Sequence, residues 1–382
     1  MAAPRVFLTR CESYDPEVVR RKVEDAFDAF GGAARFGGPG RRVLVKPNLL
    51  LAAPPDKAVT THPAIVEAVA RMMLETGATV TIGDSPGVSR AVKVAEKAGI
   101  RAVADNLGVP LVDFEESVEV KTPEGFLFKK IEIARAVAEA DVVINLPKFK
   151  THGQMVLTMA TKNLFGCVAG PRKAQWHMAA GRDRDTFARL LLELSVLAAP
   201  KFSLIDGVVG MDGNGPSAGR VRPANLILAG EDAFAVDRIA ARLVGLADDA
   251  FPLIRAARKM DAFAGRFGQI EVVGGSVDAL ALHDFVLPAA AEMQWFRSRI
   301  VRRIVKRAVA ARPVVDARKC NACGTCVRSC PPEAMKIAGG RVQIDRSACI
   351  SCFCCQEMCP RQAITVRRGW LARLLIHRST PR

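Results

Sequence analysis

The chain has 382 residues, half of them hydrophobic, which is enough for a large globular core and a smaller module. No apolar run is long enough for a transmembrane helix, and residues 1–10 lack the apolar stretch of a secretory signal, so a reducing cytoplasm is expected. The net charge of +16 is concentrated in residues 292–319 and 361–382, which carry 13 of these charges, so the sequence does not indicate a nucleic-acid-binding protein.

Residues 1–290 alternate between short apolar strands and helices. Thr61 is the expected N-cap of the first well-defined helix. Strands are predicted near the N-terminus and over 42–45, 78–82, 141–145, 202–205 and 225–228, and helices over 62–76, 88–98, 187–197 and 233–244. This alternation predicts an α/β fold in which a mainly parallel sheet carries helices on both faces.

Polar segments follow four of the predicted strands. They begin at Lys46, Gly83, Leu146 and Asp206. Ligands of open α/β sheets bind beyond the carboxyl ends of the strands, so these segments are predicted to meet around one cleft.

The predicted cleft is cationic and is expected to bind an anionic or conjugated small molecule. Its lysines suit a carboxylate or a phosphate, although solvated loop lysines would give the same pattern. The residues assigned to catalysis are Lys46, Asp84, Lys148 and His152. The residues assigned to substrate binding are Lys46, Asn48, Ser85, Lys150, Lys162 and Asn163.

Three of the five histidines, His62, His152 and His177, lie in or near the same segments. Imidazole titrates near neutral pH, so one of them is a candidate general acid or base, and with Asp84 or Asp206 they are also candidate metal ligands. Helix capping alone would explain His62. No glycine-rich segment stands in the context of a dinucleotide site, so no flavin or other second cofactor is indicated, although a flavin is compatible with the sequence.

Two basic segments flank a cysteine-rich part of the chain. Residues 291–312 are predicted to form a basic amphipathic linker helix with its apolar stripe within 292–309. Residues 367–382 form a basic tail, in which residues 370–376 repeat the same chemistry. Such helices either pack on their own protein or contact an acidic partner or an anionic membrane surface, which would place the protein peripherally at the inner membrane face.

Eight cysteines form two copies of the pattern C-x2-C-x2-C-x3-C-P. This spacing holds cubane iron–sulfur clusters, and the fourth cysteine of each run ligates the other cluster. The expected ligands of cluster 1 are Cys320, Cys323, Cys326 and Cys359. The expected ligands of cluster 2 are Cys349, Cys352, Cys355 and Cys330. The sequence therefore predicts two 4Fe–4S clusters.

Other uses of these cysteines fit the pattern less well. Zinc sites rarely place a third cysteine three residues on and a fourth before proline, and disulfides are not expected without a secretory signal. Cys354 is an additional thiol beside Cys355. Residues 313–366 resemble a bacterial-type two-cluster ferredoxin, which implies a small α+β domain, and residues 336–344 are predicted to form its Gly-Gly hairpin.

Several motifs in residues 1–290 resemble the domain-of-unknown-function family 362. They are Val45-Lys46-Pro47-Asn48, Thr61-His62-Pro63, Gly83-Asp84-Ser85-Pro86, Leu146 to His152, and Thr158 with Lys162 to Gly166. Members often carry a C-terminal two-cluster ferredoxin module. The resemblance implies an iron–sulfur redox protein and names no substrate.

Three functions are compatible with these features. The first is an oxidoreductase in which the clusters pass electrons to the cationic cleft, with a separate redox partner protein. The second is an electron-transfer or maturation component whose α/β domain docks a partner protein. The third is a redox sensor at the membrane surface.

Overall fold

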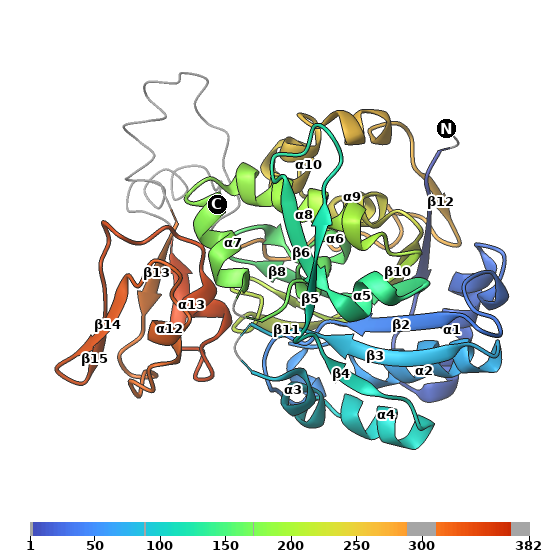
Figure 1. Ribbon diagram of the computed structural model, residues 1–382, viewed down its shortest axis with the longest axis horizontal. Helices are drawn as coiled ribbons and strands as arrows, with labels where there is room; N and C mark the ends of the chain where they lie inside the picture. Colours follow the sequence, from blue (N-terminus) through green and yellow to red (C-terminus); the bar gives the residue numbers. More distant parts are fainter. Residues whose placement is uncertain (1–2, 88, 171, 289–310, 368–382) are drawn as a thin grey trace.

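The computed structural model describes residues 3–87, 89–170, 172–288 and 311–367. These residues form an α/β body and a small C-terminal module packed against its side (Figure 1). The predicted linker helix over 291–312 and the basic tail over 367–382 lie almost entirely outside the described residues. The same holds for the apolar stripes within 292–309 and 370–376.

A ten-stranded sheet organises the body. Its order is β12-β1-β11-β10-β7-β2-β3-β4, and β8 and β9 extend it beside β10. Strand β11 is antiparallel to both β1 and β10, whereas β10, β7, β2, β3 and β4 are parallel, so the predicted mainly parallel sheet is confirmed. The strands are β1 Arg5–Arg10, β2 Arg42–Pro47, β3 Thr79–Asp84, β4 Leu111–Asp113, β7 Val142–Leu146, β8 Lys148–His152, β9 Val156–Leu157, β10 Phe202–Asp212, β11 Arg220–Gly230 and β12 Glu271–Val273.

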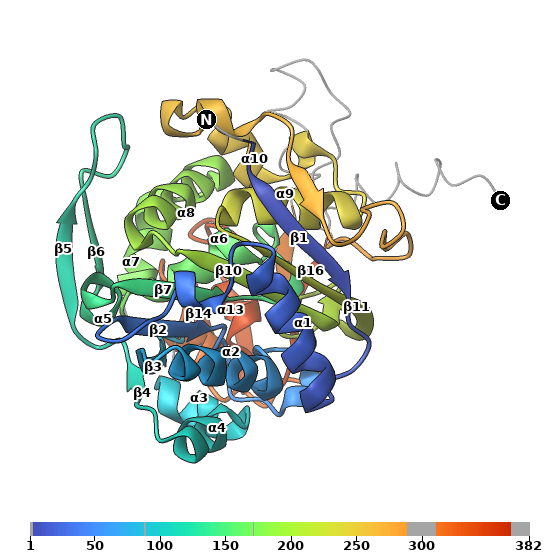
Figure 2. The ribbon, with the colours of Figure 1, turned by 90° about the vertical axis from the view of Figure 1, so that its right-hand side faces the viewer.

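Helices cover both faces of this sheet, with α1 and α2 on one side and α8 and α9 on the other (Figure 2). Alternation along β2 produces the two cores, because Leu44 joins one while Val43 and Val45 join the other. The helices are α1 Pro16–Asp28, α2 Pro63–Glu75, α3 Ala91–Lys97, α4 Ile100–Leu107, α5 Arg135–Glu139, α6 Ala160–Asn163, α7 Arg172–Ala180, α8 Arg184–Ala198, α9 Ala233–Leu243 and α10 Pro252–Ala257. A hairpin of β5 Ser117–Lys121 and β6 Lys130–Ala134 projects beside them.

Three local predictions differ from the structure. His62, rather than Thr61, caps α2, because its ring nitrogen accepts the Ala64 amide while the Thr61 hydroxyl donates to the Leu146 carbonyl. The polar segment after Leu146 is a strand, β8, because Pro147 turns the chain and Lys148 then pairs in register with Asp206 of β10. Strand β10 continues through Asp206 to Asp212, where a loop was expected.

The module is a small α+β unit. Its strands are β13 Arg312–Val315, β14 Met335–Ala338, β15 Arg341–Ile344 and β16 Ile364–Arg367, and its helices are α12 Thr325–Arg328 and α13 Cys354–Glu357. Strands β14 and β15 form the predicted hairpin, in which Gly339 and Gly340 both have positive φ, as its two-residue turn requires. One small apolar core contains cysteines of both motifs, among them Cys326, Cys355 and Cys359.

Candidate functional site

A cavity of about 310 Å³ lies where the body meets the module. The body supplies the segments after β2 and β3, the end of β8, and α6 and α7. The module supplies residues that neighbour its cysteine ligands, namely Arg328, Ser329, Pro331, Cys354, Glu357 and Met358. The cavity therefore exists only where the two parts of the chain touch.

Most of the residues assigned from the sequence line this cavity. They are Asn48, Asp84, Ser85, Lys150, His152, Lys162 and Asn163, and His177 joins them. The carboxyl ends of β2 and β3 and the end of β8 bring these side chains together, as expected for an α/β sheet. Lys46, Lys148 and His62 are not among the lining residues.

Lys46 lies behind the cavity wall and is paired with Asp84. Its ammonium is 2.7 Å from Asp84 Oδ1, both side chains are buried, and Asp84 Oδ2 accepts the Leu49 amide at 2.7 Å. Gly166 makes room for this pair, because a Cβ there would lie 2.1 Å from Asp84 Oδ1 and 2.5 Å from Lys46 Nζ. The pair thus fixes the carboxylate of Asp84 at the cavity.

Lys148 belongs to a different buried cluster. Its ammonium donates to Asp206 at 2.7 Å and to the Tyr14 hydroxyl at 2.6 Å, and Tyr14 donates to the other oxygen of Asp206. The ring of His62 stacks on Tyr14 with centroids 3.5 Å apart, and the His62 amide donates to Asp206. Every polar group of this cluster has a partner, which is the arrangement of a structural network.

Lys162 lines the cavity with its ammonium unpaired among the described residues. It is 9% exposed, and within the described residues its ammonium forms no hydrogen bond or ion pair, although it lies 5.9 Å from the ring centroid of Phe165. Burial lowers the pKa of Lys150, which donates only to the Val59 carbonyl, and Lys162 lowers it further. Burial also lowers the pKa of Lys173 to about 7, and its ammonium donates to two carbonyls. Three lysine ammonium groups therefore stand at the cavity, and none of them has a carboxylate partner among the described residues.

Several buried acceptors at the cavity have no hydrogen-bond partner among the described residues. Asn163 is 5% exposed and donates its amide to Asn145, which leaves Asn163 Oδ1 without a donor. Asn48 Oδ1 and His177 Nδ1 are unpartnered in the same way. Buried polar atoms are normally hydrogen-bonded, so these atoms mark positions for ligand or water.

His152 lies at the contact between body and module. Its Nδ1 accepts the amides of Gln154 and Met155, so the neutral ring carries its proton on Nε2, which is 2.5 Å from Glu357 Oε1. Burial lowers the pKa of His152 to about 4, and nearby Lys162 adds to the effect. A neutral imidazole and a carboxylate thus share one proton position at the cavity wall.

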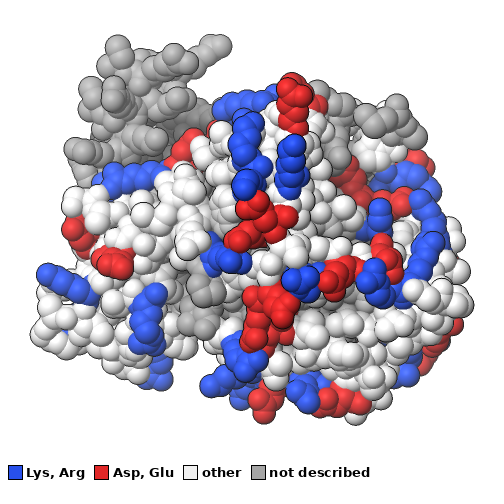
Figure 3. Space-filling model, viewed as in Figure 1, with Lys and Arg blue, Asp and Glu red and all other residues white. Residues whose placement is uncertain are grey.

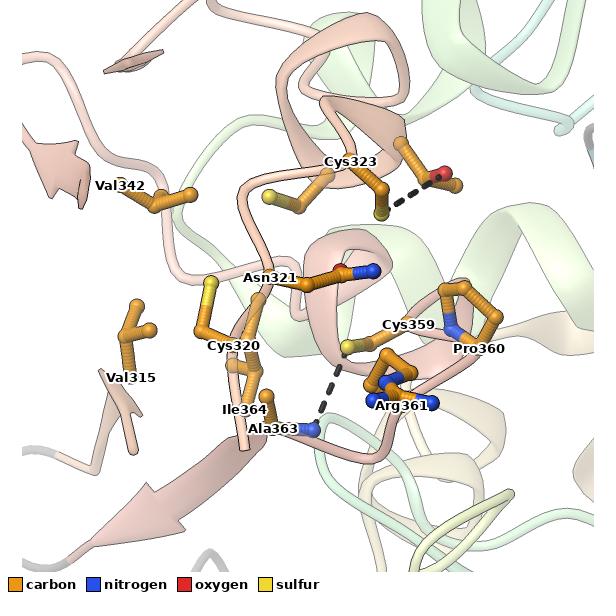
Figure 4. A pocket seen from close by; sticks show the side chains of 12 residues that line it. Val315, Cys320, Asn321, Cys323, Val342, Cys359, Pro360, Arg361, Ala363 and Ile364 are labelled. Atoms are coloured by element: carbon orange, nitrogen blue, oxygen red, sulfur yellow. Dashed lines mark hydrogen bonds between the residues drawn. The ribbon is translucent and has the colours of Figure 1, made fainter. Parts of the chain in front are cut away.

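The first set of cysteines surrounds a hollow in the module. Cys320, Cys323, Cys326 and Cys359 line it together with apolar side chains that include Val315, Val342 and Ile364 (Figure 4). Three of these cysteines come from the first motif and one from the second, which is the crossed arrangement expected for cluster 1. The Cys359 sulfur also accepts the Ala363 amide at 3.3 Å.

The second set of cysteines is also assembled from both motifs. Burial raises the pKa of Cys330 to about 11, and nearby Cys352 and Cys349 contribute to the rise. Within the described part of the chain, no three His, Cys, Asp or Glu side chains converge tightly enough to hold a single metal ion. Thiols spaced around a hollow fit a cubane, whose ligands stand farther apart than those of one zinc ion.

Several residues of the cavity were not assigned to it from the sequence, among them Glu357, Cys354 and Lys173. Glu357 and Cys354 stand among the cysteine ligands, and only folding brings the module against the body. Lys173 lies in a segment for which no helix or strand was predicted. Helix α7 places Lys173 beside Ser85, and the Lys173 ammonium donates to the Ser85 carbonyl at 2.7 Å.

The fold and this site together define an α/β protein with a C-terminal iron–sulfur module. Residues 43–242 match a family described as domain of unknown function (DUF362), and residues 312–360 match a 4Fe-4S dicluster domain. The chain belongs to the DUF362 family. The resemblance inferred from its motifs is confirmed.

A relative and two solved structures add to this. The thylakoid-associated protein sll1697 of Synechocystis sp. is 37% identical over 255 residues, which cover 67% of this chain and 79% of the relative. A lactate racemase apoprotein from Thermoanaerobacterium thermosaccharolyticum (TM-score 0.42, 13% identity) and a protein from Thermotoga maritima (TM-score 0.40, 14% identity) each align with 62% of this chain. The chain spans 57% and 60% of their lengths. Among the described helices, none is long and apolar enough to cross a membrane.

Proposed function

We propose that this protein is an oxidoreductase that binds a small anionic molecule in the cavity between body and module. Its module would hold two 4Fe–4S clusters, one on Cys320, Cys323, Cys326 and Cys359 and the other on Cys349, Cys352, Cys355 and Cys330. When bound, such clusters accept and release single electrons. Residues next to Cys330 and Cys355 line the cavity, so a molecule there would lie beside the second ligand set.

One observation supports the anionic ligand most directly. Lys162 is buried at the cavity with no carboxylate or carbonyl against its ammonium in the described residues. A buried cation without a partner is costly, and an anionic group of the ligand would supply the partner. Asn48 Oδ1 and Asn163 Oδ1 need donors, so the ligand would also carry hydroxyl or amino groups. Hydroxycarboxylates, amino acids and phosphate monoesters have this chemistry.

The other side chains have distinct roles in this proposal. Asp84, held by Lys46 and the Leu49 amide, would accept from the ligand without bringing an uncompensated charge. His152 and Glu357 hold one proton at the cavity wall, where it is available to the bound molecule. Lys148 would act only through Asp206 and β10, as a residue that positions the sheet rather than one that contacts the ligand.

The test is ligand binding by the cluster-loaded protein under anaerobic conditions. Calorimetry with a panel of hydroxycarboxylates, amino acids and phosphate monoesters should find a binder, and Lys162→Met should weaken its binding at least about ten-fold, as expected for loss of one charged hydrogen bond. Lys201→Met is the matched control, because Lys201 is exposed just before the amino end of β10, whereas the cavity lies at the carboxyl ends of the parallel strands. Iron content should stay unchanged in both variants.

Two results would contradict the proposal. One is that no member of the panel binds the wild-type protein. The other is that Lys162→Met binds as tightly as the wild type. Either result would favour a body that docks a partner protein instead.

A further inference from the structure

The hollow formed by the first cysteine set has an open face at the surface of the module. Cys323 is exposed, and so are Asn321, Pro360 and Arg361 at the edge of the hollow. Ser329, Pro331 and Cys354, which neighbour Cys330 and Cys355 of the second set, instead line the interdomain cavity. The first cysteine set therefore has an exposed rim, and the second set lies beside the proposed binding site.

Cations gather around this open face. Lys319 precedes Cys320, Arg341 precedes Val342 of the hollow, and Arg361 itself lines it. All three side chains are exposed. We name Lys319, Arg341 and Arg361 the cationic face.

Few acidic groups compensate these charges. Glu333 and Asp345 are the exposed acids of residues 311–367, whereas Glu357 is buried and Asp316 is half-buried beside Arg318. Lys319, Arg341 and Arg361 form no ion pair with any described residue. Figure 3 shows blue side chains outnumbering red ones on the module, while the body carries both colours interleaved. In the body, charged side chains form ion pairs such as Arg20 with Glu17 and Arg135 with Glu116.

We propose that the cationic face binds an acidic redox carrier protein. The inference deepens the proposed function, because an oxidoreductase with an enclosed cavity needs an external electron carrier, and the exposed rim at Cys323 is where such a carrier can approach a cluster ligand. A cubane with four thiolate ligands has a negative charge that would repel an acidic carrier, and the surrounding cations offset this repulsion. A lipid surface or a nucleic acid fits the charge but exchanges no electrons.

Electrostatic attraction between the two proteins would make their association depend on salt. Opposite charges speed the encounter and orient the partners, and salt screens them beyond about 10 Å at an ionic strength of about 0.1 M. Exposed charges contribute more to association than to tight packing. We therefore expect a transient complex with marked dependence on ionic strength.

The experiment is anaerobic calorimetry of the cluster-loaded full chain with a flavodoxin of net negative charge as the probe. Affinity should fall at least about ten-fold when ionic strength rises from about 0.02 M to about 0.3 M. At the lower ionic strength, Lys319→Glu combined with Arg361→Glu should weaken binding at least about ten-fold. Arg41→Glu combined with Lys201→Glu is the matched control, because these residues precede β2 and β10 at the amino ends of the strands. This double variant should change affinity less than about two-fold.

Equal affinity of the two double variants would overturn the proposal. The proposal would also be contradicted if the variant with Lys319→Glu and Arg361→Glu kept flavodoxin binding but lost binding to phosphatidylglycerol vesicles. The face would then be a lipid-binding surface. Lys162→Met should leave flavodoxin affinity unchanged, since Lys162 lies in the cavity. Failure of carrier docking and failure of ligand binding are therefore distinguishable.

Discussion

At the scale of single residues, His177 is a cavity-lining imidazole that burial keeps neutral. Its ring stacks on Phe187 with centroids 4.4 Å apart and meets the edge of Phe165. Burial lowers the pKa of His177 to about 3, from an ordinary value of 6.5. The folded protein therefore holds this ring neutral in a range of pH where the unfolded chain protonates it.

The pH dependence of stability follows from this difference. The folded pKa is depressed, so the contribution of His177 is present above pH 6.5 and is lost as pH falls toward 3. Between pH 6.5 and 5 the free energy of unfolding should fall by roughly 2 kcal/mol more in the wild type than in His177→Phe. The phenylalanine keeps the ring contact but does not titrate. His62 and His152 titrate in both proteins and cancel in the comparison. Thermal midpoints across this range check the prediction, and parallel curves for the two proteins would contradict it.

At the scale of elements, the short helix α13 links the two parts of the chain. It carries Cys355 and also contacts the segment after β10. Gln356 is fully buried, and its amide donates to the carbonyls of Asn214 and Gly215 at 2.7 and 2.9 Å. Ser217 donates in return to the carbonyls of Gln356 and Glu357. A helix of four residues is too short to be stable by itself, so its contacts with the body stabilise it.

Gln356→Ala should loosen this junction. Two buried carbonyls would lose their donors, which costs about 1–3 kcal/mol each when water does not replace them. Amide hydrogen exchange of residues 214–217 should then accelerate at least about ten-fold, while iron content is retained. Gln343→Ala, at an exposed position of β15, is the control and should leave exchange there unchanged. Unchanged exchange in the Gln356 variant would show that the junction does not depend on these bonds.

At the scale of the whole molecule, the body and the module have different sources of stability. The body has two extensive apolar cores on the two faces of its sheet. The described part of the module has two small apolar clusters, and its own cysteines contribute to the larger one. A unit of this size buries too little apolar surface to fold well without its metal groups.

Removal of iron should therefore unfold the module selectively. Anaerobically purified protein should contain about eight iron atoms per chain. After chelation, residues 312–367 should become sensitive to protease while residues 3–288 remain protected. Limited proteolysis with mass spectrometry checks this outcome. Loss of protection throughout the body would indicate that the two parts fold as one cooperative unit.

The sequence was sufficient for the architecture and for the local chemistry. Apolar alternation predicted the parallel sheet, and cysteine spacing predicted which thiols share a hollow, because both patterns are set by neighbours along the chain. The sequence did not predict which partner each charged group would have. Lys148 and Lys150 are two residues apart, yet one is paired with Asp206 and the other lines the cavity. That distinction, like the contribution of Glu357, depends on long-range packing.

The division of the cavity between body and module has a consequence for damaged molecules. Glu357, Cys354 and Met358 can form its outer wall only while the module is folded. If oxygen destroys the clusters, we expect this wall to open and the ligand to escape. Under the proposed function, a copy that has lost its clusters would then stand empty rather than retain a ligand.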